Sequence, residues 1–533
     1  MQNSSTDLGY KWISKALGVA PVQPFRVTSG IGSGMSALQQ GRTTHKTYTR
    51  VYAPEPTLAG HLTFALKYEG VDLDFLARVF QRTGADFVRE WVRQEPTSAY
   101  ARRAGFFFEW LTGQEMDGIQ DAGGNYVDAM DAKRYFVATQ ASKNRRWRIN
   151  DNLPGTPAFC PMIERSKTLR DTASLSAGIK TLMDDFGEET LMRAVHWLTV
   201  KESRASFAIE SEGKEEDRIH RFARAMVMHC GQMEEPLSEA SLETLQSGIM
   251  GAISTGFRPG LRRSPVFVGH TADYQPVIDY LAPGFKDVPG MMEGLRAVAQ
   301  RTLGQHSVLR AAALSFGLVY IHPLADGNGR ISRFLINDTL RRDGVIPAPV
   351  ILPVSAVISA SAQHRHAYDQ ALEVFSQPLM RDFGKACSFA QEVQYEDGVR
   401  SNLKFELWDD ALPSWRYPDL TLQAQYLSQV IDAALTDGLR AEAHYLSRYD
   451  KAEQALKLRV EGSSEDYARI IRSITQNRGV SAKLKKIYPL VFEDASRSER
   501  IAADILRAFN ATDGDDDDDD ENADPIETVK PIL

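Results

Sequence analysis

Apolar residues recur at helical spacing along most of the chain. In the N-terminal third, four short stretches place apolar side chains on one face and are separated by Gly, Pro and Thr: residues 62–68, 73–81, 86–92 and 100–111. This pattern predicts a mainly helical N-terminal region. A turn-forming cluster at residues 152–157 places the end of that region near residue 160.

The next part of the chain has helical spacing of its apolar residues, followed by a short segment with the composition of strands. An amphipathic helix is predicted at about 188–212, and a helix capped by Ser238 is predicted at 238–250. Residues 265–268 and 276–280 have the composition of two short strands, which predicts a small β-hairpin.

Helical spacing then returns in a segment that is apolar almost all round. Residues 308–320 contain so few polar positions that we expect a central core helix there. Residues 401–512 are also predicted to be helical. Within them, residues 467–489 fit two hypotheses, a helix-turn-helix that binds nucleic acid and an ordinary helical hairpin with a solvated basic face.

The composition is that of a globular protein. A chain of 533 residues with 43% hydrophobic and 25% charged residues can bury two to four cores of about 150 residues each. Its three cysteines are far apart and form no CxxC pair, which predicts reduced thiols and a cytoplasmic location. The uncharged stretch 344–363 is interrupted by three prolines, so we expect no membrane span.

Acidic charge is concentrated at the end of the chain. The formal net charge is −8, but residues 513–533 contain an aspartate run and further Asp and Glu residues, so residues 1–512 are close to neutral. This self-repelling segment cannot build a core and is predicted to be disordered. We consider two roles for it, a solubilising tail and an arm that competes for a basic groove.

The chemistry is concentrated directly after the predicted core helix. Residues 322–333 read His-Pro-Leu-Ala-Asp-Gly-Asn-Gly-Arg-Ile-Ser-Arg. Pro323 stops the helix, which leaves His322 beside an irregular loop where an imidazole can act as a base. Gly327 and Gly329 permit a tight turn, and the N–H groups at 327–330 begin the next helix. We call these N–H groups the anion seat.

Three charged residues complete this group. Arg330 and Arg333 lie in the first turn of the second helix, where cations oppose the helix dipole, so an anionic partner is implied. Asp326 offers a hard oxygen ligand suited to Mg²⁺ that is held partly by substrate oxygens. Any one of these residues alone has a simple structural explanation, but together they indicate nucleotidyl or phosphoryl transfer.

These residues resemble the hallmark of the Fic family, His-Pro-Phe-x-Asp/Glu-Gly-Asn-Gly-Arg-x-x-Arg. The departure is Leu324 in place of Phe, an apolar exchange that is expected to leave the chemistry intact. The resemblance covers roughly residues 188–375. It implies a mainly α-helical Fic core with a small β-hairpin flap, within a Fic domain at 161–400 that is flanked by helical regions at 1–160 and 401–512.

The resemblance also implies an activity, the transfer of AMP from ATP to a protein hydroxyl. His322 would be the general base and Asp326 the Mg²⁺ ligand, and the Gly327–Gly329 loop with Asn328 would bind the α- and β-phosphates. Arg330 and Arg333 would bind the β- and γ-phosphates. Gly329 favours this activity over that of the related Doc-type kinases, which carry Lys there.

A second motif resembles the inhibitory Ser/Thr-x-x-x-Glu-Gly/Asn of the family's N-terminally inhibited class. It runs from Ser206 to Glu210, and Ser211 replaces the usual Gly or Asn. Glu210 would pair with Arg333 in the place of the γ-phosphate, so the resting enzyme is expected to be weak.

Several alternatives and partners stay open. The same motifs are compatible with an enzyme that removes AMP, with other nucleotidyl or phospho-group donors, and with a nucleic-acid-associated regulator whose Fic site is silent. The expected partners are an unidentified target protein, the chain itself through self-modification, and a second copy in a homo-oligomer.

Overall fold

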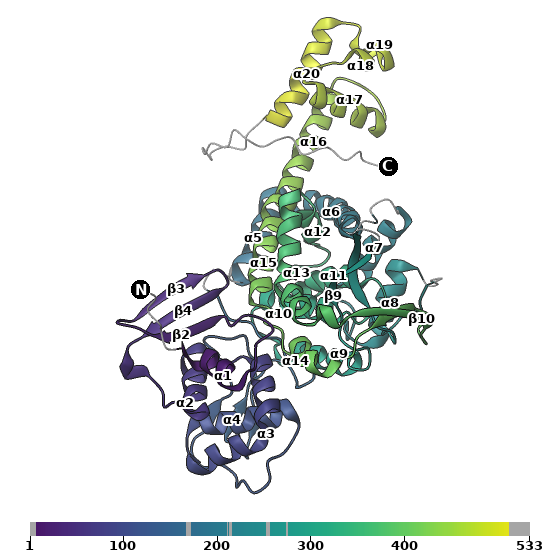
Figure 1. Ribbon diagram of the computed structural model, residues 1–533. Coiled ribbons are helices and arrows are strands. Elements are labelled where there is room, and N and C mark those ends of the chain that lie inside the picture. Colours follow the sequence, from purple (N-terminus) through teal and green to yellow (C-terminus); the bar gives the residue numbers. More distant parts are fainter. Residues whose placement is uncertain are drawn as a thin grey trace. The chain divides into compact units, whose positions relative to one another are not determined.

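The structure is a computed structural model (Figure 1) that describes residues 7–166, 172–210, 212, 216–251, 256–272 and 275–510. The chain divides into two compact units, Met1–Asp185 with Val195–Arg440 and Phe186–Ala194 with Ala441–Leu533. The boundaries predicted near residues 160 and 400 both fall inside the first unit. The acidic tail at 513–533 and Ser211 lie outside the described residues.

The N-terminal part of the first unit contains helices and two small sheets. The helices are α1 (Gly9–Leu17), η1 (Arg50–Tyr52), α2 (Leu58–Phe64), η2 (Ala65–Glu69), α3 (Leu73–Gln94) and α4 (Ala99–Thr112). One sheet has the order β1-β2-β4-β3, formed by Asp7–Leu8, Val27–Ile31, Thr43–Tyr48 and Ser36–Gln40. The other has the order β5-β7-β6, formed by Val127–Asp128, Ile149–Asp151 and Ser142–Asn144.

The sequence analysis predicted neither sheet. β3 is exposed at every position and β4 is mostly polar, so these strands lack the alternation of buried and exposed side chains that marks a strand in sequence. The helices of this part are held by close packing around Trp147. A Cβ on Gly105 of α4 would lie 2.3 Å from the Trp147 ring, so the ring can reach α4 only because this position is glycine.

The rest of the first unit is mainly helical, as predicted. Its helices are α5 (Thr172–Phe186), α6 (Glu188–Ile209), α7 (Glu216–His229), α8 (Glu239–Met250), α9 (Val288–Arg301), α10 (Ser307–Ile321), α11 (Asn328–Arg342), α12 (Val354–Ile358), α13 (Ala362–Phe383), η3 (Gly384–Ala386), α14 (Trp408–Arg416), α15 (Thr421–Ala433) and η4 (Ala434–Arg440), with α5 and α6 reaching into the second unit.

The central helix is α10, which packs against α9, α11 and α15 (Figure 1). Nearly all of its side chains are buried, and this confirms the core helix predicted at 308–320. Ser238 caps α8 as expected, since its side chain accepts a hydrogen bond from Ser241 N. Within the described ranges, every helix is too short or too polar to cross a lipid bilayer.

The predicted hairpin is present. β8 (Phe267–Ala272) pairs with β9 (Gln275–Leu281) in antiparallel register, with an irregularity after Val268. A Cβ on Gly269 would lie 2.1 Å from the carbonyl oxygen of Val277, so glycine is required at this irregularity. A second hairpin, β10 (Ser388–Gln394) with β11 (Arg400–Lys404), was not predicted because every residue of β10 is exposed and its sequence carries no clear alternation.

The second unit is a helical bundle. Its helices are α16 (Ala441–Lys457), α17 (Ser464–Asn477), α18 (Ala482–Ile487), α19 (Pro489–Phe492) and α20 (Ala495–Asn510). Its core contains Ile470, Ile474, Leu484 and Ile501. A short turn joins α17 to α18, and α18 has only six residues. The helix-turn-helix hypothesis stays a prediction.

Candidate active site

His322 lies immediately after α10 in the left-handed backbone region, with φ 49° and ψ 58°. Two contacts stabilise this uncommon conformation. The His322 N–H donates to the Leu318 carbonyl at 2.8 Å, and Nε of the buried Arg262 donates to the His322 carbonyl at 2.6 Å. Pro323 follows and prevents the helix from continuing. The backbone therefore holds the imidazole at a defined place beside the loop.

The hydrogen bond of the His322 ring defines which nitrogen can act as a base. Nδ1 lies 3.2 Å from the carbonyl oxygen of Val319. A carbonyl only accepts, so Nδ1 carries the proton and Nε2 keeps its lone pair. Burial, together with the positive charge of Arg262, lowers the pKa of His322 to about 4. The imidazole is therefore neutral at neutral pH and has a free acceptor nitrogen.

The loop after His322 is closed by Asn328. Its side-chain oxygen accepts from Leu324 N at 3.0 Å, and its amide nitrogen donates to the Leu324 carbonyl at 2.8 Å. Gly327, with φ 92°, then turns the chain into α11. Both polar atoms of the Asn328 side chain are therefore hydrogen-bonded within the loop. Asn328 can contribute only its backbone N–H to the anion seat. Leu324 is fully buried, so the exchange for Phe affects packing alone.

Asp326 stabilises the same loop by accepting three hydrogen bonds. Its Oδ1 accepts from Gly327 N at 2.6 Å and from Arg330 Nη2 at 2.8 Å, while its carbonyl accepts from Gln246 Nε2 at 2.8 Å. The side chain remains 41% exposed. Among the described residues no group of three or more His, Cys, Asp or Glu side chains could enclose a metal ion. One exposed carboxylate nevertheless fits Mg²⁺, which commonly keeps several waters and substrate oxygens as ligands.

Both arginines of the hallmark are buried, and each contacts a carboxylate. Arg333 Nη2 donates to Glu210 Oε1 at 2.9 Å, and its Nε donates to Ser206 Oγ at 2.9 Å. Arg330 Nη1 donates to Glu212 Oε2 at 2.7 Å. The structure therefore brings together Ser206, Glu210 and Arg333, the three residues that the resemblance associates with inhibition.

The carboxylate of Glu210 lies at the start of α11. A Cβ on Gly329 would be only 2.2 Å from Glu210 Oε1, so the carboxylate lies directly over this glycine. Burial works against the charged form of Glu210, but Arg333 and then Arg330 outweigh it and lower the pKa of this carboxyl below its ordinary value. A negative group therefore already lies beside the anion seat.

Several residues that organise the site are not predicted by the sequence. Arg262 and Gln246 hold the backbone of His322 and Asp326, and their long-range contacts leave no signal in the sequence. Glu202 accepts from the backbone of Ser355, and burial raises its pKa to about 7. Its spacing of four residues before Ser206 was a signal that could have been used, because it places both residues on one face of α6.

Glu212 was named only as a helix end, although it contacts Arg330. The guanidinium of Arg330 also lies over the Phe207 ring, 4.8 Å from its centroid. Both hallmark arginines are therefore engaged by residues from the C-terminal end of α6 and the segment after it.

Comparison with known proteins identifies the segment that carries this site. Residues 236–340 match the model of the Fic/DOC family. This segment is a Fic domain. It contains α8, the β8–β9 hairpin, α9, α10 and most of α11, while Ser206 on α6 and Glu210 directly after α6 lie before it.

Alignments with curated relatives cover only part of this chain and only part of each relative. The "Protein adenylyltransferase Fic" of Culex quinquefasciatus is 35% identical over 124 residues, which are 23% of this chain and 21% of the relative. "Protein adenylyltransferase fic-1" of Caenorhabditis elegans is 28% identical over 130 residues, 24% of each chain. The chain thus spans less than a quarter of the length of these relatives.

Solved structures of Fic proteins also align with this chain, with low sequence identity and low TM-scores. A Fic family protein from Desulfovibrio desulfuricans G20 aligns with a TM-score of 0.35 and 18% identity, over 57% of this chain and 86% of that protein. A Fic domain containing signaling protein from Bacteroides thetaiotaomicron aligns with a TM-score of 0.35 and 20% identity, over 51% of this chain and 97% of that protein.

Proposed function

We propose that this chain is a protein adenylyltransferase, which transfers AMP from ATP to a hydroxyl side chain of a target protein. The main support is that His322 Nε2 is an unprotonated acceptor in the same loop as the anion seat. Such a base can take the proton of an alcohol, while the seat holds the phosphates that the alcohol attacks. Curated relatives that match part of the chain carry this name.

In the proposed reaction the target's hydroxyl oxygen forms a bond to the α-phosphorus of ATP. The bond from that phosphorus to the bridging oxygen breaks, and pyrophosphate leaves. His322 Nε2 accepts the hydroxyl proton. Arg330, Arg333 and the anion seat are proposed to bind the negative phosphates, since all of them belong to the first two turns of α11 or to the residue that precedes it. Asp326 would hold Mg²⁺, which when bound neutralises phosphate charge.

Glu210 is proposed to restrain this activity. Its carboxylate takes the Arg333 contact that a phosphate oxygen needs, and it lies against Gly329 in the seat. ATP must therefore displace Glu210 or bind without that contact, in a pose less suited to in-line attack. Because the pKa of Glu210 is lowered, the carboxylate stays charged at neutral pH, and proton uptake in that range does not release it.

The proposal is tested by intact-mass spectrometry of Glu210→Gly after incubation with ATP and Mg²⁺, alone and in a cell lysate. We expect AMP adducts on the variant or on a lysate protein, and fewer on the wild type. The matched control is the double variant Glu210→Gly with His322→Ala, which should form none because the base is missing.

Two results would contradict the proposal. Equal labelling of the wild type and Glu210→Gly would show that Glu210 does not restrain the activity. Loss of AMP from a previously modified protein, with no transfer by either protein, would favour the AMP-removing alternative.

A further inference from the structure

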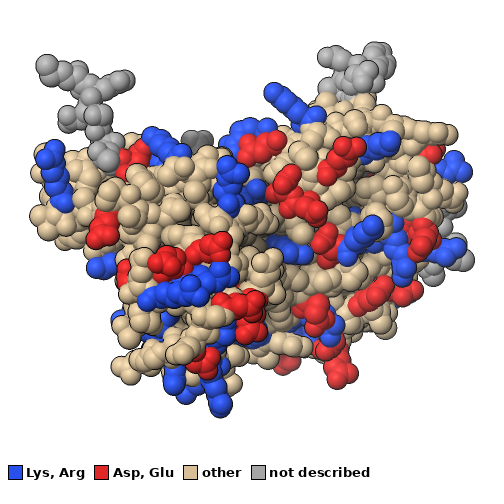
Figure 2. Space-filling view, turned by 60° about the horizontal axis from the view of Figure 1, so that its bottom comes forward, with Lys and Arg blue, Asp and Glu red and all other residues tan. Residues whose placement is uncertain are grey.

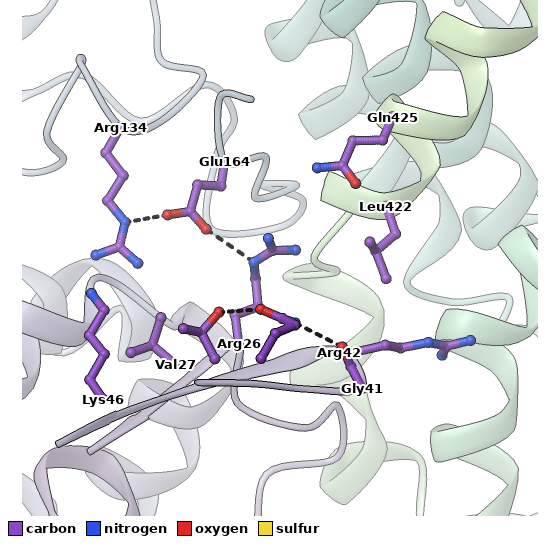
Figure 3. A pocket seen from close by; sticks show the side chains of 11 residues that line it. Arg26, Val27, Gly41, Arg42, Lys46, Arg134, Glu164, Leu422 and Gln425 are labelled. Carbon is purple, nitrogen blue, oxygen red and sulfur yellow. Dashed lines mark hydrogen bonds and ion pairs between the residues drawn. The ribbon is translucent and has the colours of Figure 1, made fainter. Parts of the chain in front are cut away.

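A polar cavity of about 520 Å³ lies in the N-terminal part of the first unit (Figure 3). Its lining comes from the β3–β4 hairpin, from the chain just before β2, from the loop residues Arg134 and Glu164, and from α15. None of these residues belongs to the candidate active site. The volume is in the range of sites that bind small molecules, about 300–1,000 Å³.

Four cationic side chains line this cavity, and one carboxylate faces them. The cations are Arg26, Arg42, Lys46 and Arg134, and the carboxylate is Glu164. Glu164 is shared, since Oε2 accepts from Arg26 Nε at 3.1 Å and Oε1 accepts from Arg134 Nε at 2.5 Å (Figure 3). One carboxylate cannot neutralise four cations, so the cavity holds excess positive charge.

Arg42 and Lys46 carry most of this excess. Arg26 has a second carboxylate, Asp419, with Nε to Oδ2 at 3.5 Å. Neither Arg42 nor Lys46 forms an ion pair within the described part of the chain. Burial, and then the charge of Arg134, lowers the pKa of Lys46. Cations gathered in a concave surface repel one another, and an anion between them would remove this repulsion.

The other groups at the cavity are suited to a polar ligand. Thr44 and Gln39 are hydrogen-bonded to each other on the hairpin, and Gln425 of α15 also lines the cavity (Figure 3). Gln39 also donates to the Gly41 carbonyl. The described lining includes no aromatic ring, so no aromatic side chain there can stack on a nucleobase. The recognition elements are therefore guanidinium, ammonium, amide and hydroxyl groups.

We propose that this cavity is a binding site for a small phosphate-bearing molecule, with Arg42 and Lys46 as its principal anion contacts. Guanidinium groups match the oxygen geometry of phosphate, and the ammonium group adds a compact charge. Arg26, Lys46 and Arg134 come from separate segments of the chain and lie around Glu164, while Arg42 extends from the β3–β4 turn at the edge of the cavity (Figure 3). That arrangement fits a compact anion better than an extended backbone.

The charge pattern on one face of the molecule agrees with a compact ligand. In the face shown in Figure 2, Lys and Arg side chains are interspersed with Asp and Glu, and no long band of positive charge is visible. Binding to a nucleic acid strand typically requires such a band or stripe of cations. We therefore favour a small phosphate compound, and nucleic acid binding becomes an outcome of the test.

The test is calorimetric titration of the full chain with inorganic pyrophosphate at low ionic strength. An Arg333→Ala background weakens binding at the Fic domain, so that binding lost on changing Lys46 or Arg42 in this background reports the cavity. We expect one saturable site in this background. Lys46→Met and Arg42→Gln should each weaken it by about tenfold, because each loses a charge-assisted hydrogen bond. Lys46→Arg should retain binding, and the matched control Arg50→Gln, an exposed arginine outside the cavity, should not change it.

Each contrary outcome overturns the proposal. Binding that Lys46→Met and Arg42→Gln leave unchanged places the anion elsewhere, and binding abolished by Arg333→Ala places it in the Fic domain. Succinate that binds as tightly as pyrophosphate would contradict the phosphate class, and binding of single-stranded DNA without pyrophosphate would contradict a small ligand. Circular dichroism melting curves show whether each variant is folded, and Lys46→Arg provides a folded variant with its charge retained.

Discussion

Gly329 and Glu210 depend on each other at the start of α11. The sequence analysis assigned Gly329 to phosphate binding, because a glycine leaves the backbone accessible. In the structure the carboxylate of Glu210 uses that space, since a Cβ on Gly329 would lie 2.2 Å from its Oε1. The motif predicted the residue types of the site. It could not predict this contact, which depends on where the end of α6 packs.

The dependence predicts a measurable coupling. Gly329→Ala should push the Glu210 carboxylate away from Arg333 and lower the free energy of unfolding in the wild type. In a Glu210→Gly background the same change should cost less, with a coupling of about 0.5–3 kcal/mol, typical of contacting residues. Urea unfolding of the four proteins measures it. Additive effects would show that the two residues are independent.

The lowered pKa of His322 predicts the pH at which activity is lost on the acid side. Because burial and Arg262 lower its pKa to about 4, the imidazole of the free protein stays unprotonated as pH falls, until about pH 4. In the Glu210→Gly variant, kcat/KM should therefore keep its acid limb well below the ordinary histidine value of 6.5. An acid limb near 6.5 would show that His322 is not the base or is not buried as described.

At the scale of elements, α6 positions the proposed restraint. Glu202 and Ser206 lie on it four residues apart, and Glu210 follows four residues later, directly after the helix ends. Glu202 is hydrogen-bonded to Ser355 N and Oγ and to Ala356 N at the start of α12. The buried end of this row anchors the helix, and Glu210 reaches Arg333. Amphipathic spacing was sufficient to predict α6, but not to tell which of its polar residues are buried.

Glu202 should give the protein a characteristic pH dependence. Burial raises its pKa to about 7 from 4.5, so the folded protein holds a proton there that the unfolded chain releases. Its contribution to stability is therefore largest at low pH and is lost as pH rises from about 4.5 to 7. Glu202→Gln should remove that part of the slope in urea unfolding measured across this range. An unchanged slope would contradict the burial of a titrating Glu202.

The same contrast explains which elements the sequence predicted. The apolar helix α10 was found because burial imposes a clear pattern on its residues. The β8–β9 hairpin was found because its β-branched and aromatic residues favour strands, although most of its described side chains are not buried. The hairpins β3–β4 and β10–β11 were missed because their exposed, polar strands carry almost no such pattern. Their pairing is visible only in three dimensions.

At the scale of the whole molecule, the N-terminal region packs against the Fic domain within the first unit. The expected boundary near residue 160 was based on a turn-rich sequence. In the structure, Cys160 N donates to the Arg416 carbonyl and Met162 N to the Pro418 carbonyl. Phe159 is fully buried close to Gly294 of α9 and Gly317 of α10. Turn-forming residues can therefore lie inside a packed unit, and turn composition alone does not mark its end.

Phe159 should accordingly contribute strongly to stability. Phe159→Ala removes a buried ring and leaves a cavity beside α9 and α10, at an expected cost of about 3–5 kcal/mol. The matched control is Phe389→Ala, whose ring is 38% exposed and should cost much less. Urea unfolding measures both. Equal costs would show that the N-terminal region does not pack against the Fic domain in this way.

The central claim is that the site transfers AMP. The most direct measurement is to incubate Glu210→Gly with ATP radiolabelled either at the α-phosphate or at the γ-phosphate, and to record label retained on protein. The account predicts label from the α-position only, and none when His322→Ala is added. Label from the γ-position, or retention that is independent of His322, would contradict it.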